Sequence, residues 1–266
     1  MKAYQRGFTL IELLISVVIA MIISAAIFGI YANSAGSSAA MLKSSKLNQE
    51  LFSLMLVMSN DIRRAGYWMP ADPTDLEEPH NNPFSKDTTQ LLLITNDSER
   101  IPDDSTSPAI PGNAAIQTSC IVYSFDENGN EDVTGQIYGF RLNGNAVEML
   151  DDSSNTTIDT DECKTDKWQS VTDTNLIKIT KLSFSRSESE CVYANFPDVD
   201  CYANPPDTYK TTLDPEYKNY VDSLFTVETR QVRIELSGEL VSDPSVKASV
   251  EQVVRVRNDR VKEWPL

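Results

Sequence analysis

A run of 24 residues, Phe8 to Tyr31, constrains the fold of this chain more than any other feature, because it is apolar almost throughout. About 20 such residues span the hydrocarbon core of a bilayer as a helix. The one side chain in the run that is charged at neutral pH is Glu12. A carboxylate at membrane depth costs roughly a few kcal/mol, so it indicates a specific partner.

The flanking charges predict how this segment crosses the membrane. Lys2 and Arg6 precede the run and the next basic residue is Lys43, so we expect a cytoplasmic amino terminus and a single pass. A secretory signal would have a shorter apolar core followed by a small-residue cleavage site, which Ala32–Ala35 imitates. The length of the run and Glu12 argue against that reading. A plain signal anchor is the other alternative, but it has no use for a buried carboxylate.

The helical pattern continues beyond the membrane segment as one apolar stripe. Its members recur at three- and four-residue spacing: Leu47, Leu51, Leu54, Met55, Met58 and Ile62. We therefore predict one helix from Phe8 to about Arg64, roughly 85 Å long at 1.5 Å per residue. Gly66 and Pro70 are expected to end it.

The rest of the chain predicts a β-rich head. Segments rich in Val, Ile, Thr and aromatic residues are Gln90–Thr95, Ile121–Phe125, Gln136–Leu142, Ala146–Leu150, Leu176–Ser185, Thr226–Ser237 and Lys247–Arg257. Asn143-Gly144 predicts a hairpin between two of them. The alternation from Val232 to Leu236 predicts a sheet with one buried face and one solvent-exposed face.

The formal net charge of −16 argues against direct binding of nucleic acid, because no basic stripe is evident in the head. Enzymatic motifs are missing as well: there is one histidine, His80, and no nucleophile, phosphate-loop or zinc-protease pattern. A pair of carboxylates could in principle act on glycosides, but nothing selects a pair among 39 acids. We expect the protein not to be an enzyme.

Four cysteines, Cys120, Cys163, Cys191 and Cys201, would lie outside the cytoplasm, where disulfides persist. They allow three connectivities, which the sequence does not settle. We predict sequential pairing, Cys120 with Cys163 and Cys191 with Cys201. Metal binding is the alternative, but the cysteines lack CxxC spacing.

One acidic segment has weak calcium-loop character. Asp126, Asn128, Asn130 and Asp132 place oxygen-bearing side chains at alternate positions. The distant bidentate glutamate of a full calcium loop is missing, and the same residues suit a plain turn. We predict a turn and no cofactor, with calcium as the alternative.

Residues Gly7 to Ser16, GFTLIELLIS, behind a short basic leader, resemble the class III signal of type IV prepilins and of type II secretion pseudopilins. The resemblance implies that a prepilin peptidase cuts between Gly7 and Phe8 and methylates the new terminus. Phe8 would become the first mature residue and Glu12 the fifth. In that family the acid is thought to neutralise the terminal amine of a neighbouring subunit during assembly.

Two further segments resemble the PilW type of minor pilins: DIRRAGYW, from Asp61 to Trp68, and VVRVRN, from Val253 to Asn258. The resemblance implies an α+β pilin fold, in which a long amino-terminal helix packs on an antiparallel sheet. The expected organisation is a leader (1–7), a transmembrane or filament-core helix (8–31), the periplasmic half of that helix (32–66) and a globular head (67–266).

The implied function is that of a minor pilin in a complex that initiates type IV pilus assembly and sits near the tip. Attachment, twitching motility and DNA uptake by the whole pilus would follow. Implied partners are the prepilin peptidase, the inner-membrane assembly platform, the major pilin, other minor pilins and a tip adhesin. Before assembly the protein would lie in the inner membrane with a periplasmic head, and it would then be incorporated into the extracellular fibre. The alternatives are a J-type minor pseudopilin of type II secretion and a membrane-anchored periplasmic binding module.

Overall fold

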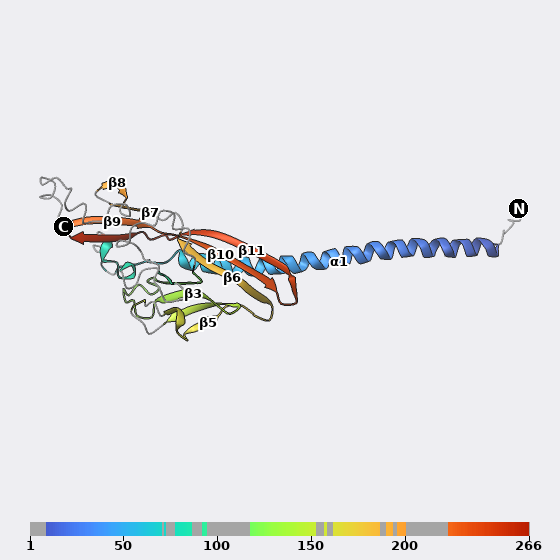
Figure 1. The fold of residues 1–266 in the computed structure, drawn as a ribbon, viewed down its shortest axis with the longest axis horizontal. Coiled ribbons are helices and arrows are strands. Elements are labelled where there is room, and N and C mark those ends of the chain that lie inside the picture. Colours follow the sequence, from blue (N-terminus) through green and yellow to red (C-terminus); the bar gives the residue numbers. More distant parts are fainter. Residues whose placement is uncertain are drawn as a thin grey trace, which may run out of the picture. The chain divides into compact units, whose positions relative to one another are not determined.

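The computed structural model describes residues 9–70, 72, 78–86, 92–94, 118–152, 157–158, 162–186, 190–193, 196–200 and 223–265. The chain divides into two compact units, Met1–Lys46 and Leu47–Leu266. Helix α1, Leu10–Ile62, runs through the boundary, so its residues from Leu47 onward belong to the second unit (Figure 1).

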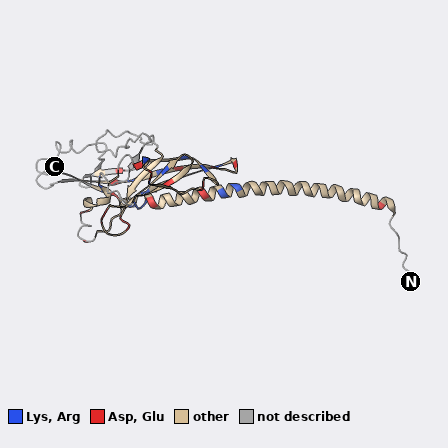
Figure 2. Cartoon of the chain, turned by 90° about the horizontal axis from the view of Figure 1, so that it is seen from below, with Lys and Arg blue, Asp and Glu red and all other residues tan. Residues whose placement is uncertain are grey.

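The first unit contains the apolar part of α1. After Glu12 near its start, the helix carries no charged side chain until Lys43 and Lys46 (Figure 2). Its residues up to Lys46 are exposed, including Phe28 and Ile30, each at 72%. Water is a poor solvent for such a surface, so this unit requires an apolar environment.

The second unit begins with the apolar stripe of α1. All six predicted stripe residues are buried, and Leu47, Leu51 and Ile62 are completely inaccessible. The prediction is confirmed, because the three- and four-residue spacing places these side chains on one face of the helix.

A five-stranded antiparallel sheet follows the order of the chain (Figure 1). Its strands are β1 (Leu92–Ile94), β2 (Cys120–Ser124), β3 (Ile137–Asn143), β4 (Ala146–Asp152) and β5 (Trp168–Ser170). The hairpin predicted between β3 and β4 exists, but its two loop residues are Gly144 and Asn145, one position later than predicted, since Asn143 pairs with Ala146. Gly144 has a φ of 59°, which suits the first loop position of a type II′ turn.

A three-stranded antiparallel sheet has the order β11, β10, β6. Its strands are β6 (Ile177–Arg186), β10 (Gln231–Leu240) and β11 (Asp243–Arg255). Residues of β10 alternate between buried and partly exposed along its whole length. The predicted alternation from Val232 to Leu236 is therefore confirmed, with one face of this sheet turned to the core.

A four-stranded antiparallel sheet has the order β12, β9, β7, β8. Its strands are β7 (Glu190–Tyr193), β8 (Phe196–Asp200), β9 (Ser223–Thr229) and β12 (Arg260–Pro265). The prediction of one strand over Thr226–Ser237 is wrong, because β9 and β10 belong to different sheets. The break falls at buried Arg230, whose carbonyl accepts a hydrogen bond from the Val256 amide (2.9 Å).

Three short 3₁₀ helices complete the described elements: η2 (Pro79–Asn81), η3 (Pro83–Ser85) and η5 (Glu162–Lys164). The first two lie in the proline-rich segment that follows α1.

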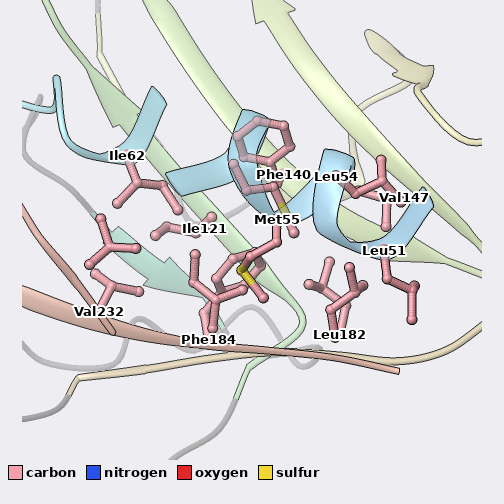
Figure 3. Packing of buried hydrophobic residues seen from close by; sticks show 14 of the residues in the cluster. Leu51, Leu54, Met55, Ile62, Ile121, Phe140, Val147, Leu182, Phe184 and Val232 are labelled. Atoms are coloured by element: carbon pink, nitrogen blue, oxygen red, sulfur yellow. The ribbon is translucent and has the colours of Figure 1, made fainter. Parts of the chain in front are cut away.

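One hydrophobic core joins the helix to two of the sheets. Figure 3 shows side chains of α1, among them Leu51 and Met55, between Phe140 and Val147 of the five-stranded sheet and Phe184 of the three-stranded sheet. The α+β, pilin-like class is confirmed, and the described part of the head contains three antiparallel sheets.

Candidate functional site

The start of the helix is the first candidate site, because the predicted processing and assembly residues meet there. Gly7 and Phe8 lie outside the described residues. The described chain begins at Thr9, and α1 starts at Leu10. Among the predicted residues of this site, Glu12 is the one whose contacts are described.

Thr9 and Glu12 form a capping box. The Glu12 Oε2 atom accepts hydrogen bonds from the Thr9 amide (3.0 Å) and the Thr9 hydroxyl (2.9 Å), and the Thr9 Oγ1 atom accepts one from the Glu12 amide (3.3 Å). Each side chain thus satisfies a backbone donor that the first turn leaves open. The carboxylate is therefore already partnered within the single chain.

Thr9 is a residue that our sequence reasoning missed. The signal was present, since Thr9-Leu10-Ile11-Glu12 matches the [S/T]-x-x-E pattern of a capping box.

Within the described part of the chain, α1 is the helix that is long and apolar enough to cross a membrane. None of its most apolar stretch is covered by other parts of the molecule. An exposed apolar helix with a capped start fits either lipid or the apolar helices of other subunits.

The end of the helix is the second candidate site, and Gly66 determines its geometry. Gly66 has a φ of 72°, and its amide donates to the Ser124 carbonyl (2.8 Å) at the end of β2. A β-carbon at this position would lie 2.8 Å from the Ser85 hydroxyl and 2.9 Å from Arg230 Nη2. Both the conformation and the space therefore require glycine.

Charged and backbone groups of the same segment contact the residues that directly follow β2 of the five-stranded sheet. Asp61 and Arg64 form an ion pair one turn apart at the end of α1. The Arg64 guanidinium carbon lies 4.1 Å from the centroid of the Phe125 ring, a cation–π geometry. The Tyr67 carbonyl accepts from the Asp126 amide (2.8 Å), so the chain beyond the helix follows the end of β2.

The carboxy-terminal segment contacts this helix end directly. The Arg257 amide donates to the Arg63 carbonyl (3.0 Å). The Asn258 side-chain amide lies 3.4 Å from the Arg64 carbonyl and 3.3 Å from the Ala65 carbonyl. The two segments that carried the PilW resemblance, almost 200 residues apart, are thus hydrogen-bonded neighbours.

A disulfide joins Cys120 of β2 to Cys163 of η5, which is the first of the two predicted pairs. Arg141 supports it: its Nη1 atom donates to the Cys163 carbonyl (2.6 Å), and its guanidinium lies over the Trp168 ring at 4.7 Å. Glu148 pairs with Arg141 at 2.7 Å. The disulfide therefore closes a packed corner of the five-stranded sheet.

The second predicted pair involves residues that the structure describes in part. Cys201 lies outside the described residues, and Cys191 is described in its backbone as part of β7. Their sequence neighbours, Val192 and Asp200, are register partners across β7 and β8. The pairing of Cys191 with Cys201 stays a prediction.

The weak calcium candidate is a hydrogen-bonded loop. Asp126 is buried and accepts from the amides of Gly129 (2.7 Å) and Met69 (3.3 Å). Asn130 accepts from the Asp132 amide (3.1 Å), and Asp132 accepts from Thr134 (2.9 Å), which lowers the pKa of Asp132. Asn128 is exposed. Turn formation accounts for these oxygen atoms, and calcium binding stays an untested alternative.

No group of three or more His, Cys, Asp or Glu side chains that could hold a metal ion is found in the described parts of the chain. Three acids of the three-stranded sheet, Glu235, Glu239 and Glu251, have basic partners instead. Glu239, for example, lies 3.1 Å from Lys247 and 3.4 Å from Lys178.

A membrane-length apolar helix with one acid in its first turn, followed by a large α+β head, defines a pilin-like protein. Comparison with known families agrees with this class at both ends of the helix. Residues 2–28 match the prokaryotic N-terminal methylation motif, which includes Gly7, Phe8 and Glu12. Residues 40–256 match the family described as prepilin peptidase-dependent protein B.

The second match covers most of the chain, so the protein belongs to the prepilin peptidase-dependent protein B family. No curated protein and no solved structure matches the chain significantly. The predicted membership of the type IV pilin-like proteins is confirmed, and the finer PilW type is a proposal.

Proposed function

We propose that this protein is a minor pilin of a type IV pilus, of the PilW type, which helps to initiate pilus assembly and lies in a complex near the tip. Membership of the family and the methylation motif support the pilin-like part of this proposal. The DIRRAGYW and VVRVRN segments support the PilW type, because they contact each other and organise the junction between helix and head. The large second unit, from Leu47 onward, suits a specialised subunit better than a major pilin that repeats along the fibre.

The observation that carries the proposal is the position of Glu12 at the first turn of an exposed apolar helix. Cleavage after Gly7 would create a cationic amine on Phe8, four residues or about one helical turn before Glu12. In the isolated chain Thr9 satisfies the carboxylate. During assembly, the amine of a neighbouring subunit would replace Thr9 as its partner.

This exchange would set the axial register of the subunit. An apolar surrounding strengthens an ion pair, but desolvation of both charges offsets much of that gain. A wrongly placed subunit would leave the carboxylate unpaired in an apolar environment. Burial of an unpaired charge costs several kcal/mol or more. The pair would therefore contribute register more than net stability.

The proposed partners are the prepilin peptidase, the inner-membrane assembly platform, the major pilin, other minor pilins and a tip adhesin. The proposed location is the inner membrane, with a cytoplasmic amino terminus and a periplasmic head, followed by incorporation into the fibre. The protein would contribute to attachment, twitching motility and DNA uptake as a structural subunit, without enzymatic activity or a cofactor and without contacting nucleic acid itself.

The experiment is complementation of a deletion strain with wild type, Glu12→Ala or Glu12→Gln. Surface pili are counted, twitching and protein secretion are assayed, and the mature amino terminus is identified by mass spectrometry. The proposal is supported if the deletion strain loses its pili and only wild type restores them. The mature protein should then begin with a methylated Phe8. Glu12→Gln serves as the isosteric control, because it keeps the size of the side chain and removes its charge.

Two alternatives predict different results. Normal pili with defective secretion would identify a J-type minor pseudopilin, which shares the signal and the pilin-like fold. An uncleaved leader together with full activity of Glu12→Ala would identify a membrane-anchored periplasmic binding module. The second result would contradict both pilus and pseudopilus functions.

A further inference from the structure

The outward face of the three-stranded sheet carries a ladder of paired charges. Basic and acidic side chains alternate between neighbouring strands in four described ion pairs: Lys181–Glu235, Arg233–Glu251, Lys178–Glu239 and Lys247–Glu239. Opposite charges directly across a sheet stabilise it modestly and leave little net charge on the surface. This face is therefore electrically balanced along most of its length.

The balance ends where the sheet meets the end of the helix. Arg63, Val253, Arg255 and Arg257 line an open cavity of about 490 Å³, which we name the arginine pocket. The hydrogen bond from the Arg257 amide to the Arg63 carbonyl (3.0 Å) holds two of these residues side by side. Val253 and Arg255 lie at the end of β11, and Arg63 and Arg257 follow closely after the ends of α1 and β11.

The pocket has an excess of positive charge. Arg255 lies 3.5 Å from Asp259, which offsets one of the three arginines. Within the described part of the chain, the guanidinium groups of Arg63 and Arg257 have neither an ion pair nor a hydrogen bond. Two uncompensated cations at neighbouring positions repel each other, so an anion placed between them would be attracted by both.

The charges around the pocket and its donor groups indicate the kind of anion. Extended nucleic acid requires a basic stripe that follows several phosphates. Here Asp259 pairs with Arg255, Glu251 lies two residues before Val253 on β11, and the chain has a net charge of −16. A single carboxylate matches the fork of donors that an arginine presents. Val253, which is 38% exposed, offers an apolar surface for the stem of a glutamate side chain.

We propose that the arginine pocket binds a carboxylate side chain from an acidic segment of a partner protein. Arg63 and Arg257 provide the two free guanidinium groups, Arg255 adds a third next to them, and Val253 contacts the side-chain stem. Since the pocket lies at the junction of α1 and β11, it links the docking of a partner head to the end of the helix. The proposal goes beyond pilus assembly and does not require it, since any acidic partner of the head would satisfy the site.

The test measures binding of a fluorescent tetraglutamate peptide to the full mature chain in detergent at low ionic strength. The variant Arg63→Gln/Arg257→Gln is compared with Lys178→Gln/Lys181→Gln, which removes the same charge from paired positions of the ladder. We expect the first variant to weaken binding by at least about tenfold, because each lost charge-assisted hydrogen bond is strong. The control should stay within about twofold of wild type, since its charges are remote and compensated.

Further measurements make the result specific. Circular dichroism and thermal unfolding should be unchanged in Arg63→Gln/Arg257→Gln, because the lost groups have no described partners in the fold. A tetraglutamine peptide should not bind. The proposal is overturned if tetraglutamate binding does not saturate, or if both variants lose peptide binding equally. It is also overturned if inorganic phosphate or a short single-stranded oligonucleotide binds more tightly than the peptide.

Discussion

Glu228 and Arg260 form a buried ion pair across two paired strands, with 3.7 Å between Arg260 Nη1 and Glu228 Oε2. The two residues are register partners of β9 and β12, and each side chain is at most 8% exposed. Arg260 also donates from Nε to the Ser85 carbonyl (3.0 Å) in η3. The pair therefore ties the edge of the four-stranded sheet to the segment that follows the helix.

Loss of the acidic partner should destabilise the head strongly. We expect Glu228→Ala to lower the free energy of unfolding by about 3–5 kcal/mol, because it leaves the Arg260 charge buried without that partner. Urea unfolding of the full chain, followed by tryptophan fluorescence, measures the change. The exposed Arg233–Glu251 pair supplies the control, and Glu251→Ala should cost about 1 kcal/mol or less. Equal effects of the two substitutions would contradict the importance of burial.

Substitution of Gly66 should lower the stability of the protein more than substitution of an ordinary turn glycine does. Gly66→Ala combines a positive φ with contacts under 3 Å to Ser85 and Arg230, whereas Gly144 has a positive φ and open space around it. The left-handed conformation alone costs about 1–2 kcal/mol for alanine. Gly144→Ala should show that cost, and Gly66→Ala should exceed it by at least about 1 kcal/mol, as overpacking does. The difference between their thermal unfolding midpoints reports the crowding.

Both predicted disulfides can be tested by peptide mapping. Digestion without reduction should release one linked peptide pair with Cys120 and Cys163 and another with Cys191 and Cys201. The first bond closes a separation of 43 residues, and its removal by Cys120→Ser/Cys163→Ser should cost about 4 kcal/mol in the chain-entropy model. A peptide that links Cys163 to Cys191 would show that the sequential pairing is wrong.

The charge ladder should make stability depend on acidic pH. The hydrogen bond from Lys181 lowers the pKa of Glu235 from its ordinary 4.5, and the bond from Lys247 lowers that of Glu239. The folded chain thus binds fewer protons here than the unfolded chain. This contribution is present above about pH 4.5 and is lost as the pH falls through the lowered folded pKa values.

Urea unfolding between about pH 6 and pH 3 measures this loss. In Lys181→Gln/Lys247→Gln the fall in stability should be shallower than in wild type, because the pKa values of the two carboxylates lose the largest cause of their lowering. Arg63→Gln/Arg257→Gln removes the same net charge from residues without described carboxylate partners. The stability of this variant should fall with decreasing pH as steeply as that of wild type. A shallower fall in this variant would identify net charge as the cause.

The capping role and the assembly role of Glu12 can be separated through Thr9. Thr9→Val removes the hydroxyl that the Glu12 carboxylate and amide contact, so the first turn should lose about 1 kcal/mol of capping stability. Pilus assembly should persist, because the carboxylate remains available to a neighbouring amine. Counting of surface pili in Thr9→Val and Glu12→Ala strains checks this. Equal defects would mean that Glu12 acts through the helix cap.

Much of the local structure was predictable because its signals repeat over short distances. The stripe from Leu47 to Ile62 and the alternation in β10 each report which side of an element is buried. Every predicted strand segment contains a strand. The hairpin loop was misplaced by one residue, since glycine at the first loop position favours a type II′ turn over the type that begins with asparagine.

The sequence by itself determined the apolar helix with Glu12, the buried stripe of its second half, the position of most strands and the processing motif. These features depend on neighbouring residues and on transfer from water, both of which a linear pattern records. Only the tertiary structure decided the change of sheets at Arg230, the contact of Arg257 with Arg63 and the arginine pocket. Those features join residues far apart in the chain, and their partners depend on how the helix and the sheets pack together, which no short-range periodicity encodes.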